Sequence, residues 1–263
     1  MIYMKTVIVT GASSGIGLAT AKLFLQNGFS VYDFSRSGKD GEIHHIECDV
    51  TDEESVKRAV SLVIEKEGKI DVLVNNAGFG ISGAAENTPT EKAKKQFDVN
   101  FFGSFNVSKA VIPYMRDRKS GMIINISSMA APLSIPFQLF YSASKSAINS
   151  LTLALANELR PFGIKVCAVM PGDVKTGFTA AREKETDSGF YSSVLNKSVQ
   201  TMEHDEENGM SPEEIAKAVY RLSQKKNPKP LSTVGLQYKT FALLAKLLPA
   251  RAVNYIIGQL YAK

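Results

Sequence analysis

The sequence of 263 residues predicts an α/β fold, in which one Rossmann-type, doubly wound parallel sheet of about seven strands is flanked by helices. Short apolar runs alternate along the chain with longer helical patterns, as in folds built from right-handed crossovers. Runs such as Val-Ile-Val at 7–9 and Val-Leu-Val at 72–74 are apolar on consecutive positions. Strands that are buried on both faces of a parallel sheet require that pattern.

The elements follow one another in a regular order. Strands are expected at 5–10, 30–35, 43–48, 70–75, 122–127, 164–170 and 231–234, and helices at 15–27, 53–67, 89–117, 138–160 and 212–224. Three helix starts have a hydroxyl residue with Glu three positions later, the pattern of a capping box, at Thr51, Thr88 and Ser211. No repeat or low-complexity linker interrupts the series, so we expect one domain over residues 1–235, extended by amphipathic helices over 236–263.

The composition is that of an ordinary globular protein, with 44% hydrophobic and 22% charged residues. The net charge of +5 is unevenly distributed, because residues 225–263 hold seven lysines and arginines and no acid, so that residues 1–224 sum to −2. A nucleic-acid-binding surface is therefore not expected.

The cysteines and histidines argue against a disulfide framework and against a metal site. Cys48 and Cys167 are too few for a disulfide framework. The sequence contains neither a secretory signal nor an apolar run of 18 residues. We therefore expect a cytoplasmic protein. His44 and His45 are neighbours on an expected strand and point to opposite faces, and His204 lies in an acidic run. No metal site is expected.

A glycine-rich turn follows the first expected strand and precedes a helix. Gly11 permits a tight turn, Gly15 allows the backbone to approach a phosphate, and Gly17 allows the helix to pack closely against the strand. The N-terminus of a helix attracts anions. The turn therefore predicts a dinucleotide phosphate site made of Gly11, Ser13, Ser14, Gly15, Ile16 and Gly17.

The end of the second expected strand indicates which dinucleotide binds. An acid at this position holds the ribose 2′-hydroxyl of NAD, whereas a 2′-phosphate requires a cation. The strand ends with Ser35-Arg36, and Asp33 lies two residues earlier on the strand itself, out of reach. Because the Arg36 guanidinium can clamp a phosphate, NADP(H) is favoured over NAD(H).

A tyrosine and a lysine four residues apart open the helix at 138–160. The i, i+4 spacing of Tyr141 and Lys145 places both side chains on one helix face, where an ammonium favours the phenolate and lowers the pKa of the phenol. Ser128 follows the apolar strand at 122–127, at the carboxyl edge where parallel sheets bind ligands.

Together these motifs resemble the classical short-chain dehydrogenase/reductase family, including members that act on hydroxysteroids. The resemblance covers about residues 5–176 and includes Thr10-Gly11, Gly15-Ile16-Gly17, Cys48-Asp49-Val50, Asn75-Asn76-Ala77-Gly78, Asn100, Ile126-Ser127-Ser128, Tyr141, Lys145, Pro171-Gly172 and Thr176. It implies an oxidoreductase that interconverts a secondary alcohol and a ketone by hydride transfer from or to NADP(H). Such proteins usually pair through two long helices, so a homodimer or homotetramer is expected through 89–117 and 141–160.

The resemblance also implies roles for single residues. Tyr141 would be the general acid or base, Lys145 would lower its pKa and hold the nicotinamide ribose, and Ser128 would bind the substrate oxygen. Asn100 would hold a water that links Lys145 to solvent. The remaining cofactor contacts would come from Asp49 and Val50 at the adenine, Asn76, Ala77 and Gly78 along the cofactor, and Pro171, Gly172, Val174 and Thr176 at the nicotinamide.

Apolar residues predict the substrate pocket. Residues 175–210 form a long polar stretch that we interpret as a loop acting as a substrate lid. Its apolar members are Phe178, Phe190, Tyr191, Leu195 and Met202, and other wall candidates are Phe79, Met129, Leu133, Ile135, Phe137 and Phe140. Residues 129–140 contain no Lys or Arg, so the pocket is expected to be apolar and to accept a bulky hydrophobic alcohol or ketone.

The basic C-terminal extension is compatible with several roles. Residues 241–248 are apolar almost all round, and Val253, Ile256, Ile257 and Leu260 repeat at helical spacing. Such helices can pack as ordinary core or oligomer contacts, cover the substrate mouth or lie on an anionic membrane surface as a peripheral contact.

Three functions are therefore considered. The apolar lid and extension favour a hydroxysteroid-type dehydrogenase or a reductase of lipophilic ketones. The alternatives are a 3-oxoacyl-thioester reductase or a general carbonyl reductase, and a non-catalytic protein that senses NADP(H). The intact set of Asn100, Ser128, Tyr141 and Lys145 argues against the last.

Overall fold

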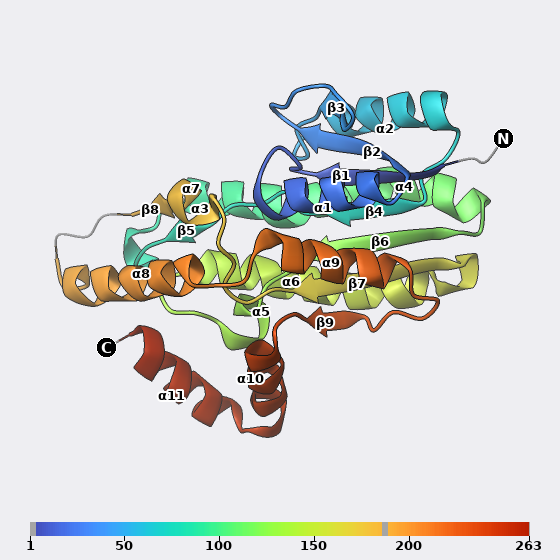
Figure 1. Cartoon of the computed structure of the whole chain (residues 1–263). Coiled ribbons are helices and arrows are strands. Elements are labelled where there is room, and N and C mark those ends of the chain that lie inside the picture. Colours follow the sequence, from blue (N-terminus) through green and yellow to red (C-terminus); the bar gives the residue numbers. More distant parts are fainter. Residues whose placement is uncertain (1–3, 186–188, 263) are drawn as a thin grey trace.

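A computed structural model describes residues 4–185 and 189–262 (Figure 1). Seven parallel strands form one sheet in the order β3-β2-β1-β4-β6-β7-β9. Their bounds are β1 (Lys5–Thr10), β2 (Phe29–Ser35), β3 (His44–Glu47), β4 (Val72–Asn75), β6 (Gly121–Ile126), β7 (Ile164–Met170) and β9 (Leu231–Thr233). The strand order reverses between β1 and β4, which confirms the predicted doubly wound sheet.

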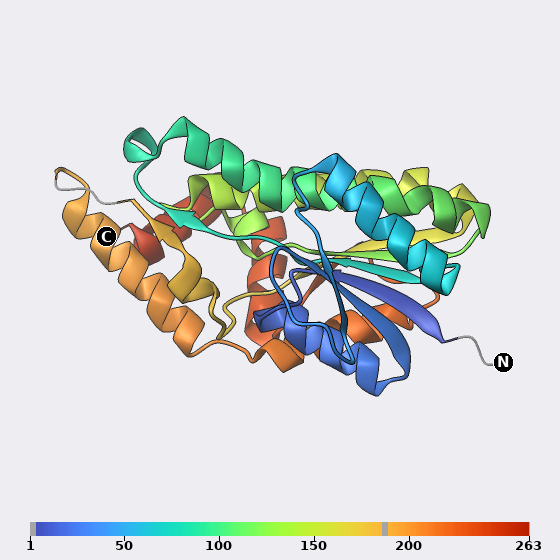
Figure 2. The same ribbon diagram turned by 90° about the horizontal axis from the view of Figure 1, so that it is seen from above.

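Helices cover both faces of this sheet (Figure 2). One face carries α2 (Glu53–Glu67), α4 (Ser104–Asp117) and α6 (Leu139–Glu158), and the other carries α1 (Gly15–Gln26) and α9 (Pro212–Ser223). The remaining elements are α3 (Thr90–Phe97), α5 (Ala130–Leu133), α7 (Phe178–Ala181), α8 (Ser192–Glu207), α10 (Leu236–Leu247), α11 (Ala250–Tyr261) and the two-stranded sheet of β5 (Ile81–Ser82) and β8 (Glu183–Lys184).

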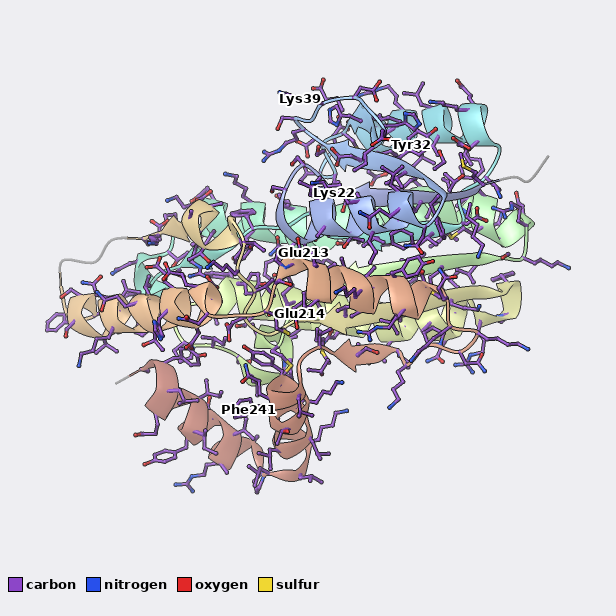
Figure 3. The ribbon with its side chains drawn as sticks, in the orientation of Figure 1. Lys22, Tyr32, Lys39, Glu213, Glu214 and Phe241 are labelled. Carbon is purple, nitrogen blue, oxygen red and sulfur yellow. The ribbon has the colours of Figure 1, made fainter. Side chains whose placement is uncertain are left out.

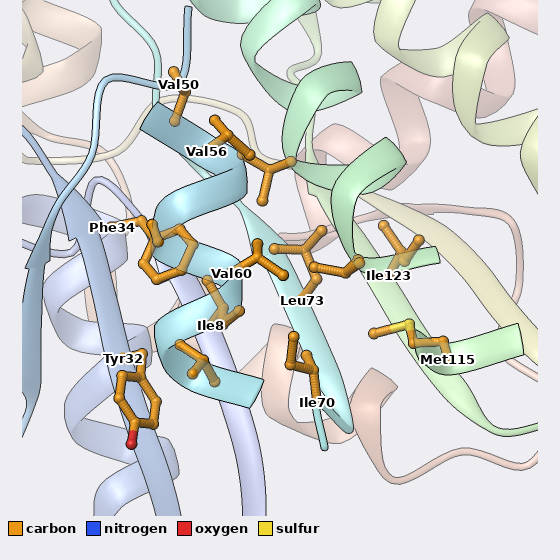
Figure 4. Packing of buried hydrophobic residues seen from close by; sticks show 14 of the residues in the cluster. Ile8, Tyr32, Phe34, Val50, Val56, Val60, Ile70, Leu73, Met115 and Ile123 are labelled. Carbon is orange, nitrogen blue, oxygen red and sulfur yellow. The ribbon is translucent and has the colours of Figure 1, made fainter. Parts of the chain in front are cut away.

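The larger apolar core lies between the sheet and the α2, α4 and α6 layer (Figure 4). Ile8, Leu73 and Ile123 from three neighbouring strands are fully buried there, against Val60 of α2 and Met115 of α4. Burial of apolar surface stabilises by roughly 25 cal/mol per Å². This rigid core fixes the carboxyl ends of the strands, from which the functional loops emerge.

The helix starts agree with the capping predictions in part. Ser211 forms a complete capping box with Glu214 at the start of α9. The box predicted at Thr51 is wrong, because Asp52 is the N-cap of α2 and its carboxylate accepts the N–H of Glu54. The box predicted at Thr88 is also wrong, since α3 begins after Pro89 without a side-chain cap.

The helix predicted at 89–117 is interrupted. It consists of α3, a π-helical segment (Asp98–Gly103) and α4. π-Helical turns are rare and are often found at functional sites. Here the π-helical segment contains Asn100, which is buried.

The interpretation of residues 175–210 as a long loop is wrong for most of its length. It contains α7, β8 and the 16-residue helix α8, in which Leu195, Val199 and Met202 are buried at helical spacing. Residues 186–188 of this predicted lid lie outside the described residues, as do residues 1–3 of the predicted domain and Lys263 of the extension.

The extension forms the two helices α10 and α11. None of the described helices is both long enough and apolar enough to cross a membrane. The cytoplasmic location stays a prediction.

Candidate active site

A cavity of about 1180 Å³ lies at the carboxyl ends of the parallel strands. It is lined by residues that follow β1, β2, β4, β6 and β7, together with residues of α8, α10 and α11. Open parallel sheets bind their ligands at this edge, where the strand order reverses. The volume exceeds the roughly 300–1,000 Å³ of an ordinary small-molecule pocket, so a dinucleotide and a substrate can occupy it together.

The glycine-rich turn after β1 forms one end of the cavity. Gly11, with φ of +66°, and Gly15, with φ of +54°, both have the left-handed backbone that favours glycine. Ser14 precedes α1 without capping it through its side chain, so the first N–H groups of the helix are left for a ligand. This uncharged cradle at a helix N-terminus fits a pyrophosphate. All members of the predicted phosphate site except Gly17 line the cavity.

Gly17 does not line the cavity but packs against the glycine-rich turn. A Cβ atom at this position would lie 2.3 Å from the carbonyl oxygen of Gly11 and 2.5 Å from Nδ2 of Asn76. The close approach of α1 to the turn therefore requires glycine. Gly17 supports the phosphate site through packing, not through contact with the cavity.

Two polar side chains fix the position of this turn. Oδ1 of Asp33 accepts a hydrogen bond of 2.8 Å from the N–H of Ala12. The side-chain amide of Asn76 donates to the carbonyl oxygens of Thr10 at 3.0 Å and Gly11 at 3.1 Å. Asp33 is buried on β2, where the sequence analysis places it, but its role as an anchor had no signal in the sequence.

Arg36 and Asp49 border the region expected to receive the adenosine. Arg36 is exposed, follows β2 directly and lines the cavity. Asp49 and Val50 follow β3 and also line it. Oδ1 of Asp49 accepts from the backbone N–H of Thr51 at 2.9 Å and from the Thr51 hydroxyl at 2.8 Å, which orients the carboxylate.

The predicted catalytic side chains meet in the middle of the cavity. Tyr141 and Lys145 lie on successive turns of α6, and Nζ of Lys145 is 5.7 Å from the centroid of the Tyr141 ring. The Ser128 side chain, which follows β6, is close enough to the Tyr141 phenol to lower its pKa. Nζ of Lys145 donates to the carbonyl oxygen of Ile126 at 2.9 Å.

Burial shifts the pKa of both groups on α6. Removal from water raises the pKa of Tyr141 to about 12, and the Ser128 side chain acts in the opposite direction. Removal from water lowers the pKa of Lys145 to about 8. The expectation that Lys145 lowers the pKa of Tyr141 is therefore wrong, because burial dominates at the phenol. Tyr141 carries its proton at neutral pH, as a proton donor must.

Asn100 lies next to this group but has contacts that the sequence did not indicate. Its Nδ2 donates to the carbonyl oxygen of Phe79 at 3.0 Å and to Oγ of Ser144 at 3.1 Å, and its Oδ1 accepts the N–H of Phe79 at 3.0 Å. A Cβ at Gly78 would lie 3.0 Å from Oδ1 of Asn100 and 3.6 Å from Nζ of Lys145. Asn100 thus fixes the chain after β4 beside Lys145.

The other predicted cofactor residues surround the same space. The cavity is lined by Ala77, Gly78, Pro171, Gly172, Val174 and Thr176, and also by Asn76. Their positions on the segments after β4 and β7 match the sequence expectation, and the cradle, the cation and the catalytic group fit a nicotinamide dinucleotide.

The predicted substrate residues divide into two groups. Phe79, Leu133 and Phe178 line the cavity, and the Phe178 ring lies 5.6 Å from that of Tyr141. Phe137 does not line it, since its ring packs 6.4 Å from that of Tyr191 instead. Of the other wall and lid candidates, Met129, Ile135 and Met202 line the cavity, whereas Phe140, Phe190, Tyr191 and Leu195 do not.

The sequence did not predict the polar groups at the far end of the cavity. Asp173, Asp205 and Glu206 line it, although the sequence predicted an apolar pocket. Asp173 accepts a hydrogen bond of 2.7 Å from the hydroxyl of Tyr238, and Asp205 accepts one of 3.3 Å from the hydroxyl of Tyr261. Burial raises the pKa of Asp173, and the Asp205 carboxylate raises it further.

Arg182 neutralises one of these carboxylates. It is buried and pairs with Glu206, which also accepts from the Thr179 hydroxyl at 2.6 Å. The other ion pair of α8 joins Lys184 to Glu203. Within the described residues, neither Asp173 nor Asp205 forms an ion pair of its own, although the Arg182 charge also acts on Asp173.

No cluster that could hold a metal ion is present in residues 4–185 and 189–262.

The C-terminal helices contribute a second set of lining residues that the sequence did not predict individually. These are Gln237, Tyr238, Phe241, Ile257, Leu260 and Tyr261. The helical periodicity of the extension could have shown that it packs, but not against which part of the fold.

Comparisons with known proteins agree with this site. A sequence profile described as short chain dehydrogenase matches residues 5–187. The chain is 41% identical to 3-ketodihydrosphingosine reductase of Bacteroides thetaiotaomicron, over 98% of both chains. It is 37% identical to the 3-oxoacyl-[acyl-carrier-protein] reductase FabG of Thermotoga maritima, over 66% of this chain and 76% of that protein.

A solved structure extends the likeness to three dimensions. A short-chain dehydrogenase from Streptomyces avermitilis superposes with a TM-score of 0.85 at 32% identity, covering 95% of this chain and 94% of that one. The profile covers the cradle, the catalytic group and every strand of the seven-stranded sheet except β9, and the superposition covers nearly the whole chain. The chain therefore belongs to the short-chain dehydrogenase/reductase family and is an oxidoreductase of that family.

Proposed function

We propose that the protein is an NADPH-dependent reductase of a long-chain ketone that carries an amine beside the carbonyl, with 3-ketodihydrosphingosine as the leading candidate. The observation that carries the substrate class is the pair of carboxylates Asp173 and Asp205, which line the cavity and have no ion-pair partner among the described residues. Both carboxylates are partly buried, and a substrate ammonium would offset the cost of keeping their charge away from water.

The position of Asp173 supports an amine close to the reacting carbon. Its charge is among the causes that raise the pKa of Tyr141, so the carboxylate acts on the phenol that faces the substrate. We expect an amine on the carbon next to the ketone to face Asp173 while the carbonyl oxygen faces Tyr141. The similarity to a 3-ketodihydrosphingosine reductase supports the same substrate class.

The chemistry divides between the cofactor and the chain. When bound, the reduced dinucleotide supplies the hydride to the carbonyl carbon. Tyr141, protonated at neutral pH, gives its proton to the carbonyl oxygen, and the Ser128 hydroxyl donates a hydrogen bond to that oxygen as its charge develops. Lys145 and Asn100 position the groups around them.

The preference for NADPH rests on Arg36. Its guanidinium follows β2, lines the cavity and can hold a 2′-phosphate, whereas the nearest acid on that strand, Asp33, is engaged with the turn after β1.

Two other substrate classes have some support. The apolar residues Phe79, Leu133 and Phe178 accommodate a ketosteroid, and the similarity to FabG favours a 3-oxoacyl thioester. A thioester on an acidic carrier meets the negative end of this cavity unfavourably. A steroid has no cation to pair with Asp173 and Asp205.

A panel of ketones tests the proposal. Oxidation of NADPH by the purified protein is followed with 3-ketodihydrosphingosine, a ketone of the same length without the amine, a 3-oxoacyl thioester and a ketosteroid. We expect the highest kcat/KM for the first. A higher value for the thioester or the steroid would overturn the substrate class, and full activity of Tyr141→Phe would overturn the catalytic assignment.

We also propose that the protein forms a dimer through α4 and α6, the helices expected to pair. These helices expose Phe105, Tyr114, Leu139 and Leu153 at fractions between 37% and 52%. Such side chains are suited to an apolar interface. Leu153→Glu is expected to reduce the oligomer in size-exclusion chromatography with light scattering, and an unchanged mass contradicts this interface.

A further inference from the structure

The C-terminal helices α10 and α11 bury little of their apolar surface. Tyr238 is the buried residue of α10 and Ile257 that of α11. The large apolar side chains that remain exposed are Leu236, Phe241, Leu243, Leu244, Leu247, Leu248, Tyr255, Ile256 and Leu260. Figure 1 shows the two helices projecting from the body beyond β9 and α5.

The three most exposed apolar residues of α10 lie on one side of the helix. Leu236, Leu243 and Leu247 fall on a single stripe at 3.6 residues per turn and are 82%, 57% and 71% exposed. Tyr238 and Ala245 lie on the opposite side, toward the body. The most apolar stripe of this helix thus faces away from its own fold, which is unusual for a surface helix.

Basic residues border this stripe. Lys239 and Lys246 of α10 and Arg251 of α11 are exposed. The chain from 225 to its end contains no Asp or Glu. A second copy of the same surface would bring these cations together without an acid to neutralise them, which opposes self-association.

We propose that this apolar and basic face of α10 and α11 docks on the surface of a membrane that contains anionic lipids. Leucine and aromatic side chains insert at the boundary between head groups and acyl chains, while flanking lysines and arginines bind anionic head groups. The face has both features, and residues 225–263 contain no acid that could pair with its cations.

The same helices connect this face to the active-site cavity. Phe241 and Leu260 line the cavity and are also 48% and 53% exposed, so the cavity opens between α10 and α11. Figure 3 shows Phe241 on α10 at the side where α11 runs. If the proposed function holds, a lipid substrate passes from the bilayer between these helices toward Tyr141 without crossing water. This step rests on the proposed function, whereas the docking face does not.

Vesicle flotation tests the docking face with the full-length protein. Vesicles of phosphatidylcholine alone are compared with vesicles of equal parts phosphatidylcholine and phosphatidylglycerol. We expect the protein to float with the anionic vesicles and to be released by high salt. Leu243→Ser/Leu247→Ser and Lys239→Glu/Lys246→Glu should each lower the bound fraction at least tenfold.

The control variant is Lys22→Glu/Lys217→Glu, which makes the same charge change on exposed residues of α1 and α9. It should float like the wild type, and circular dichroism should show all variants folded. Equal flotation of the two tail variants and the wild type, or no wild-type flotation on anionic vesicles, overturns the proposal. A tail variant that instead loses a dimer in size-exclusion chromatography identifies a second copy as the occupant. None of these readouts requires turnover, so a failure here is distinct from a failure of the substrate proposal.

Discussion

The hydroxyl of Tyr238 donates a hydrogen bond of 2.7 Å to Oδ2 of Asp173, which joins α10 to the segment after β7. The Tyr238 ring also packs directly over Gly172, where a Cβ would lie 2.2 Å from the ring. The C-terminal helix is therefore attached to the stretch that lines the cofactor end of the cavity. One carboxylate both anchors this helix and faces the cavity.

Asp173→Asn tests whether that carboxylate recognises an amine. The substitution keeps the side chain's size and a hydrogen-bonding oxygen for Tyr238 but removes the charge. Because a charge-assisted hydrogen bond contributes about 1.5–3 kcal/mol, kcat/KM for the amino ketone should fall roughly 10- to 100-fold. For a ketone of equal length without the amine, kcat/KM should change less than about threefold on the same energy scale.

Tyr238→Phe is the matched control, since it removes the hydrogen bond of 2.7 Å and leaves the charge of Asp173. It should affect both ketones equally. An equal loss for both ketones in Asp173→Asn would show that the carboxylate has only a structural role.

Arg36→Ala should separate the two cofactors. The exposed guanidinium at the end of β2 is the group expected to hold the 2′-phosphate. Its loss should raise KM for NADPH by about 10- to 100-fold and leave KM for NADH within about threefold, in line with a charge-assisted contact. Lys39→Ala, which removes an exposed cation from the same loop, is the control. Equal weakening of both cofactors would contradict the preference for NADPH.

The sequence brought the expected cofactor residues to one cavity because they belong to local motifs. The turn at Gly11 to Gly17 and the pair Tyr141 and Lys145 are each fixed by short spacings, and consecutive apolar strands set their common edge. The substrate half depends on contacts between distant segments. The bond between Tyr238 and Asp173 spans 65 residues and leaves no periodic signal.

Two predictions made from the sequence are wrong for physical reasons. Polar composition hid the helix α8, whose buried side consists of Leu195, Val199 and Met202. Electrostatic reasoning from Lys145 alone gave the wrong direction for the pKa of Tyr141, because burial cannot be read from the spacing of two residues.

Gly17→Ala should destabilise the protein and impair cofactor binding. A Cβ would meet the backbone oxygen of Gly11 at 2.3 Å, and neither α1 nor the turn can move without disturbing the phosphate cradle. Overpacking of this kind costs roughly 1–3 kcal/mol. Urea denaturation gives the free energy of unfolding, and NADPH titration gives the loss of affinity.

Gly258→Ala in α11 is the comparison, because a Cβ there meets nothing within 4 Å and the backbone is helical. It should stabilise the protein by about 0.5–1 kcal/mol. A neutral result for Gly17→Ala would show that the turn can rearrange and that close packing is not its role.

Lys145→Met tests how strongly burial acts on the active-site ammonium. The pKa of Lys145 is about 8 in the folded protein, below its ordinary value of 10.5, so the unfolded chain binds the extra proton between these two values. Stability is therefore lowered below about pH 8 and recovers as the pH rises toward 10.5. The change over this interval amounts to about 3 kcal/mol for a shift of this size.

The measurement is the difference in the free energy of unfolding between the wild type and Lys145→Met, obtained by urea denaturation at several pH values from 7 to 10.5. Taking the difference removes the contributions of Cys48 and Cys167, whose raised pKa values act equally in both proteins. It also removes any constant cost of leaving the Ile126 carbonyl without its donor. We expect the wild type to gain on the variant by about 3 kcal/mol between pH 8 and 10.5, because only the wild type has the depressed lysine. A difference that stays flat with pH would mean that Lys145 keeps its ordinary pKa in the folded protein. Lys145 would then carry its charge throughout this pH range. Its effect on the pKa of Tyr141 would have to be considered again.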